Sequence, residues 1–71
     1  MDIRLLKSKM ALRGDTQTKL AEILGIDKTT LSLKLAGKRD FKQSEMTEIV
    51  ERYRLTQRDT YRIFHKAGGG E

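Results

Sequence analysis

The chain contains neither cysteine nor proline, and His65 is its only histidine. Without cysteine there is no disulfide framework and no thiolate-ligated zinc site, and a single histidine cannot build a metal site alone. No apolar run approaches the roughly 20 residues that cross a bilayer, and the N-terminus has no apolar signal-peptide core. We therefore expect a cytoplasmic protein that binds neither a membrane nor a cofactor.

The patterns that mark active sites are missing as well. No nucleophile is placed with a base, and no glycine-rich phosphate loop follows a strand. The glycines at positions 68 to 70 lie near the end of the chain, outside any predicted helix. The sequence therefore predicts a protein that is not an enzyme and has no small-molecule ligand.

The chain has an excess of positive charge, and that charge is unevenly placed. Residues 1–42 carry ten Lys and Arg against five Asp and Glu, whereas residues 43–71 carry five of each kind. The whole net charge of +5 therefore belongs to the first part of the chain. No helix pairs a strongly basic face with a broad apolar one, so the asymmetry favours nucleic acid over a membrane as the polyanionic partner.

Apolar residues recur at helical spacing, and no segment alternates as a strand would. We predict an all-α fold in which five helices share one small core. The predicted helices cover residues 2–12, 17–24, 28–36 and 43–53, and the last one begins in the sequence TQRD at residues 56–59. Residues 1–66 form the predicted domain, and residues 67–71 form a flexible tail.

The stretch LAEILGIDKTTLS, residues 20–32, joins two of these helices by a sharp turn. Gly25 can adopt the left-handed conformation that ends a helix, and Asp27 can accept hydrogen bonds from the free N–H groups of the next one. Leu31 and Leu35 then form the apolar stripe of the second helix. We expect two short helices held at a steep angle.

The segment TQTKLAEILGIDKTTLSLKLAGKR, residues 16–39, resembles the helix-turn-helix of the phage repressor and Cro family. The matching features are a glutamine that opens the first helix, a small residue at the helix crossing, the turn glycine and two apolar anchors: Gln17, Ala21, Gly25, Ile26 and Leu31. The likeness is particularly close to small helix-turn-helix proteins of phages of Gram-positive bacteria. It covers roughly residues 3–64 and implies a five-helix, lambda-repressor-like DNA-binding domain.

Two features depart from the family pattern. Many relatives pair an arginine of the first helix with a glutamate at the end of the third, where this chain has Met10 and Leu35. We expect an apolar contact in place of that ion pair, which can be stabilising because no charge is desolvated. Relatives also often carry a polar residue at Leu33, which lies about 200° around the helix from Leu31 and should be exposed.

The face of the third helix opposite its buried stripe is the one that the resemblance assigns to DNA bases. A lysine at the helix start can donate to guanine O6 and N7, hydroxyls can bond several bases, and an exposed leucine suits a thymine methyl. The predicted base contacts are Lys28, Thr29, Ser32 and Leu33. The competing interpretation makes Leu33 a dimer or crystal contact, and Thr29 or Thr30 a helix-start residue.

Phosphate contacts are expected on either side of that face. Thr16 and Gln17 begin a helix whose free N–H groups attract an anion. Lys38, Arg39 and Lys42 flank the loop after the third helix and can clasp the DNA backbone. The competing interpretation of these three cations is a solvated charged loop.

A single helix of this kind reads few base pairs, which favours two copies on a palindromic operator, with their recognition helices about 34 Å apart. The predicted dimer surface is apolar and lies in the charge-balanced part of the chain: Leu55, Tyr61 and Phe64. We expect one of Tyr61 and Phe64 to close the core of its own chain instead. A small interface gives little affinity, which leaves room for pairing only on DNA.

The predicted function is sequence-specific binding of double-stranded DNA by a transcriptional regulator, a Cro-like protein or small phage repressor that occupies an operator. One alternative is a protein-interaction module, such as an antitoxin or anti-repressor subunit on the same fold, although the basic first part of the chain argues against it. Another is a nonspecific nucleoid or RNA binder, which needs phosphate contacts but no polar reading face.

Overall fold

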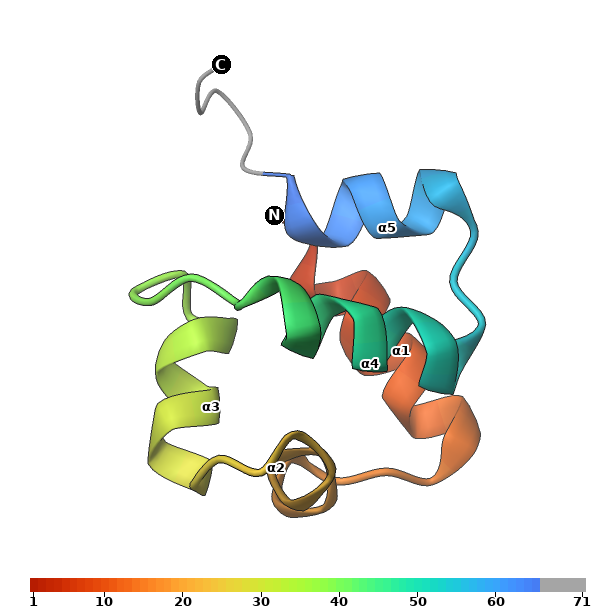
Figure 1. Ribbon diagram of the computed structural model, residues 1–71. Helices are drawn as coiled ribbons and strands as arrows, with labels where there is room; N and C mark the ends of the chain where they lie inside the picture. Colours follow the sequence, from red (N-terminus) through yellow and green to blue (C-terminus); the bar gives the residue numbers. More distant parts are fainter. Residues whose placement is uncertain (66–71) are drawn as a thin grey trace.

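The computed structural model describes residues 1–65, which form five α-helices and no strand. The helices are α1 (Ile3–Arg13), α2 (Gln17–Leu24), α3 (Lys28–Leu35), α4 (Gln43–Tyr53) and α5 (Gln57–Phe64). Figure 1 shows α4 crossing the middle of the molecule with α1 behind it, α5 above, α2 below and α3 at one side. The predicted all-α class with five helices is therefore confirmed.

The predicted helix boundaries are correct to within one residue. Asp2 caps α1 instead of belonging to it, because its side chain accepts the N–H of Leu5 at 3.1 Å. Ala36 is likewise the cap that follows α3 and not its last residue. The predicted tail, residues 67–71, and the last residue of the predicted domain lie outside the described residues. Within residues 1–65, every helix is too short or too polar to span a bilayer.

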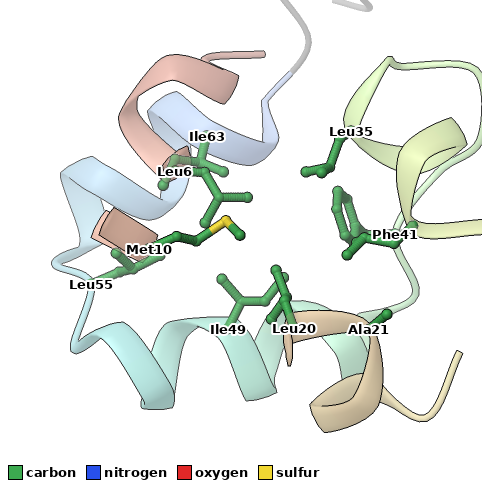
Figure 2. Close-up of a cluster of buried hydrophobic side chains, with 10 residues drawn as sticks. Leu6, Met10, Leu20, Ala21, Leu35, Phe41, Ile49, Leu55 and Ile63 are labelled. Atoms are coloured by element: carbon green, nitrogen blue, oxygen red, sulfur yellow. The ribbon is translucent and has the colours of Figure 1, made fainter. Parts of the chain in front are cut away.

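One buried cluster unites the five helices. Five side chains with no exposed surface occupy its centre, one from each helix in chain order: Leu6, Leu20, Leu31, Ile49 and Ile63. Burial of one such side chain is worth roughly 1.5–3 kcal/mol, so no helix can leave the cluster without a large loss of stability. Figure 2 shows several of these side chains converging from different helices.

Met10 and Leu35, at the positions where relatives have an ion pair, are both buried in this cluster. Figure 2 shows Leu35 beside Phe41 of the loop after α3, while Met10 points toward Ile49 and Leu20 of the opposite elements. Apolar burial at both positions is therefore confirmed. A direct contact between the two side chains stays a prediction.

The turn between α1 and α2 is held by Asp15, whose side chain is only 5% exposed. Arg52 donates from Nε and Nη2 to the two carboxylate oxygens at 2.6 and 2.8 Å, and the hydroxyl of Tyr53 donates to Oδ2 at 2.7 Å. The hydrogen bonds from Arg52 outweigh the effect of burial, and with that from Tyr53 they lower the pKa of Asp15 to about 2. This network ties the start of α2 to the end of α4.

The variant Asp15→Asn tests the contribution of this carboxylate. Its folded-state pKa lies below the ordinary 3.8, so the ionised group stabilises the fold above about pH 4 and loses that effect as the pH falls toward 2. We expect the variant to have a lower Tm than the wild type near neutral pH, and the difference to shrink between about pH 4 and pH 2. Thermal melts across this range measure it; a constant difference would contradict the assignment.

Candidate nucleic-acid interface

The turn between α2 and α3 has the conformation that its sequence predicts. Gly25 is left-handed, with φ of 72°, and the N–H of Ile26 donates to the carbonyl of Ala21 at 3.0 Å. This pattern ends α2, and Asp27 begins α3 by accepting the N–H of Thr30 at 3.0 Å. Ala21 is only 3% exposed, as expected of a small residue at a helix crossing. In Figure 1, α2 is seen end-on while α3 lies in the plane of the view, so the two axes cross steeply.

The start of α2 lies against one side of α3. Thr16 is the N-cap, and its hydroxyl oxygen accepts the N–H of Lys19 at 3.1 Å. The next residue, Gln17, is half-buried and reaches α3, where the hydroxyl of Ser32 donates weakly to Oε1 of Gln17 at 3.5 Å. The predicted anion-binding helix start and a predicted base-contacting residue are therefore neighbours, although they are 15 residues apart in the chain.

Three of the four predicted base-contacting residues of α3 are exposed, and the fourth needs a correction. Lys28, Thr29 and Ser32 are exposed, and Leu31 is completely buried. Leu33 is half-buried and not exposed as predicted. It lies where the exit turn returns to α3, and its carbonyl accepts N–H groups from both residues that follow Gly37, at 2.9 and 3.3 Å.

The exit turn fixes the basic loop onto the end of α3. Gly37 is left-handed, with φ of 79°, so Lys38 can donate its N–H back to the carbonyl of Leu33. Lys38, Arg39 and Lys42 are all exposed, in agreement with a role at a surface. Because the turn is hydrogen-bonded to α3, Lys38 and Arg39 are held close to the helix and not on a free loop.

A cleft of about 490 Å³ runs along the other side of α3. Thr30 and Lys34 line it from the helix, and Arg39 and Lys42 line it from the exit loop. On a helix, Thr30 and Ser32 lie about 100° to either side of buried Leu31. The outer face of α3 is thus flanked by the start of α2 on the Ser32 side and by two exposed cations on the Thr30 side.

Two of the residues that line this cleft form a buried ion pair that the sequence analysis missed. Nζ of Lys34 lies 2.5 Å from Oε1 of Glu45, and each side chain is only 6% exposed. The same Oε1 accepts the backbone N–H of Lys42 at 2.8 Å, which caps the start of α4. Lys34 also lies over the ring of Phe41, 5.9 Å from its centroid. One carboxylate therefore joins α3, the exit loop and α4.

The charge state of Glu45 follows from these contacts. Burial by itself would raise the pKa of the carboxyl, but the hydrogen bonds from Lys34 and from the backbone of Lys42 lower the pKa below its ordinary value. Glu45 is therefore ionised at neutral pH and forms a charge-assisted hydrogen bond with Lys34. Its position at the third residue of a helix was the one available sign of a capping role.

The predicted dimer surface needs a larger correction. Leu55 is 8% exposed and belongs to the core of its own chain. Arg54 ends α4 in the left-handed conformation, with φ of 50°, and the chain turns back so that the N–H of Leu55 donates to Val50. An apolar residue at this point of such a turn packs onto its own helix.

The two aromatic residues of that surface differ from each other. Phe64 is half-buried and packs edge-on against Phe41, with ring centroids 5.4 Å apart. Tyr61 is 62% exposed and stacks on His65 at 4.3 Å. Phe64 is therefore the one that closes the core, as expected for one of the pair, and Tyr61 remains available at the surface.

No protein-family model, curated protein or solved structure matches the chain. The resemblance to the phage repressor and Cro family therefore stays a prediction from the sequence. Within residues 1–65, no group of three or more His, Asp or Glu side chains is arranged to hold a metal ion.

The variant Lys34→Met tests the energetic role of the buried ion pair. It keeps most of the stem over Phe41 but leaves the carboxylate of Glu45 buried without its cation, which we expect to cost about 3 kcal/mol of unfolding free energy. The double variant Lys34→Met/Glu45→Gln removes both charges and should recover most of this loss. Urea unfolding of the four proteins measures both quantities. Additive losses in the double variant would contradict the coupling.

Proposed function

We propose that the chain binds double-stranded DNA sequence-specifically and regulates transcription by occupying an operator in the cytoplasm of a bacterial or phage-infected cell. The observation that carries this proposal is the arrangement around α3. Its exposed side bears Lys28, Thr29 and Ser32, and potential phosphate-binding groups flank it on two sides. A helix in the major groove needs polar groups that face the base edges and phosphate-binding groups on its two sides, because a phosphate backbone lies on each side of the groove.

The distribution of charge supports the same partner. Lys28, Lys38, Arg39 and Lys42 are exposed around α3, and Lys34 beneath them is neutralised by Glu45. Asp27, the acidic residue at the helix start, is engaged by Thr30, whose hydrogen bonds lower the pKa of its carboxyl, and Arg39 adds to that effect. Cations placed so close together favour a polyanion such as DNA over an uncharged partner.

Titration of labelled duplexes at two salt concentrations separates this function from its alternatives. Selection of bound duplexes from a random pool should return one motif, and that motif should bind at least about 10³-fold more tightly than random duplex. Absence of binding at low salt would favour the protein-interaction module. Equal affinity for all sequences would favour a nonspecific nucleic-acid binder.

The reading face predicts a loss of specificity from single substitutions. Lys28→Ala and Thr29→Ala should each weaken binding to the selected duplex by about 1–3 kcal/mol, because a base contact is lost. Binding to random duplex should change much less. Thr47→Ala, at an exposed position of α4, is the matched control. Equal losses on selected and random duplex would place Lys28 and Thr29 among the phosphate contacts.

Substitutions in the exit loop should change the salt dependence of binding and not its sequence preference. Lys38→Ala and Arg39→Ala should weaken binding to every sequence, and each should reduce the slope of log K against log salt by roughly one. The physical reason is that binding with one phosphate contact fewer releases fewer counterions, whatever the base sequence. Equilibrium titrations at four or five salt concentrations measure the slope. A slope equal to that of the wild type would mean that the loop lies off the DNA.

Two copies on one operator are part of the proposal. A single α3 offers a short reading face, and a two-fold pair doubles the base pairs that are read. Of the predicted dimer residues, Tyr61 on α5 is the one whose exposed side chain supports a contact between copies. The area is small, so pairing is expected mainly on DNA.

Stoichiometry on the selected duplex tests this pairing. We expect two chains per duplex and a palindromic motif with half-sites about 34 Å apart, one helical turn. Tyr61→Ala should leave the affinity for a single half-site unchanged and reduce the cooperativity of binding to the full site. Analytical ultracentrifugation with labelled DNA measures the ratio. One chain on a motif without two-fold symmetry would exclude the dimer.

A further inference from the structure

We infer that Lys34 and Glu45 are positioning residues for DNA recognition, which set the angle of α3 and the place of the exit loop without touching DNA. This inference rests on the proposed function and names two residues to which that function assigns no contact. Both side chains are 6% exposed, so neither offers a surface to a ligand. Their effect on binding must pass through the elements that they join.

The connection is made at one atom. Oε1 of Glu45 accepts Nζ of Lys34 at 2.5 Å and the backbone N–H of Lys42 at 2.8 Å. Lys34 belongs to α3, and Lys42 closes the exit loop as the N-cap of α4. The helix proposed to read bases and the end of the loop proposed to hold phosphates therefore share one acceptor on a third element.

The remaining contacts of α3 hold mainly its first half. Gly25 and Asp27 fix its start, and Leu31 anchors its middle in the core. Beyond Leu31, the buried residues are Lys34 and Leu35. Leu35 packs without directional bonds, because apolar contacts tolerate small shifts and rotations of a helix. The ion pair is directional, so it restricts the rotation of the last turn of α3 and, with it, the exit turn that is hydrogen-bonded to Leu33.

The directionality of the ion pair explains why this position holds two charged side chains and not two apolar ones. A buried ion pair contributes little net stability compared with apolar residues of similar size, because both charges must be desolvated. The ion pair can instead select a single orientation of α3 where an apolar contact would allow several. Base recognition depends on such a geometry, since hydrogen bonds to base edges weaken sharply with misalignment.

The test uses the full chain with Lys34→Met/Glu45→Gln, which keeps the net charge and every proposed DNA contact. We expect the affinity for random duplex to stay within about twofold of wild type, and the ratio of selected to random binding to fall about tenfold. The matched control is Lys9→Met/Asp59→Asn, which removes a pair at 3.5 Å between α1 and α5 and also keeps the net charge. Its ratio should equal that of the wild type.

Amide hydrogen exchange supplies the readout that a loss of overall stability would not produce. The amide of Lys38, bonded to Leu33, should exchange several-fold faster in the double variant, while that of Ile26, bonded to Ala21, should not change. Equal acceleration at both amides would indicate general destabilisation and overturn the inference. Where the double variant is too unstable at the working temperature, binding and exchange are measured at a lower temperature, with the wild type and the control variant under the same conditions. The same fall of about tenfold in the binding ratio is expected there.

The outcomes also separate this inference from the proposed function. A wild-type chain without sequence preference overturns both. A wild-type preference that the Lys34→Met/Glu45→Gln variant retains in full overturns the positioning role and leaves the proposed function standing. A reduced ratio in the control variant as well would assign the effect to any lost ion pair, and it too would overturn the inference.

Discussion

The buried contact between Lys34 and Glu45 is the constraint on which the candidate interface depends. The core brings one fully buried side chain from each helix to a common centre and so decides which helices are neighbours. It leaves the rotation of α3 less well defined, because apolar contacts are not directional. A single oxygen of Glu45 supplies the direction, since it bonds both α3 and the start of α4. The hydrogen bond between Lys34 and Glu45 therefore sets the orientation of the exposed face of α3.

The surface around α3 is built from helix ends more than from helix middles. Thr16 caps α2, Asp27 caps α3, and glycines at positions 25 and 37 terminate the two helices. Each of these devices satisfies backbone groups that a helix end leaves free, and each also directs the chain to its next segment. The polar residues therefore reach one surface because the turns are tightly specified. Asp15 likewise fixes the turn before α2, because its carboxylate accepts a hydrogen bond from Arg52 of α4.

The five helices and their ends could be predicted from the sequence because their signals are local: apolar spacing, a capping side chain and a glycine. The ion pair could not be predicted, because its partners lie 11 residues apart in the chain and a lysine beside an apolar stripe ordinarily keeps its ammonium group in solvent. Leu55 was misassigned to a dimer surface because Arg54, which turns the chain inward with a positive φ, is not the glycine that marks such turns. Among the site residues, exposure of Lys28, Thr29 and Ser32 was predictable, and the return of the exit turn onto Leu33 was not.

The outer face of α3 is proposed to read base edges while the flanking groups hold phosphates. NMR titration of the labelled chain with a selected duplex and with a random one tests it most directly. We expect the amides of Gln17 and Lys38 to shift with both duplexes, those of Lys28 and Thr29 to shift differently with the selected one, and those of α5 to shift only through contacts between copies. Indistinguishable shifts of Lys28 and Thr29 with the two duplexes, or shifts confined to α1 and α5, would contradict these roles.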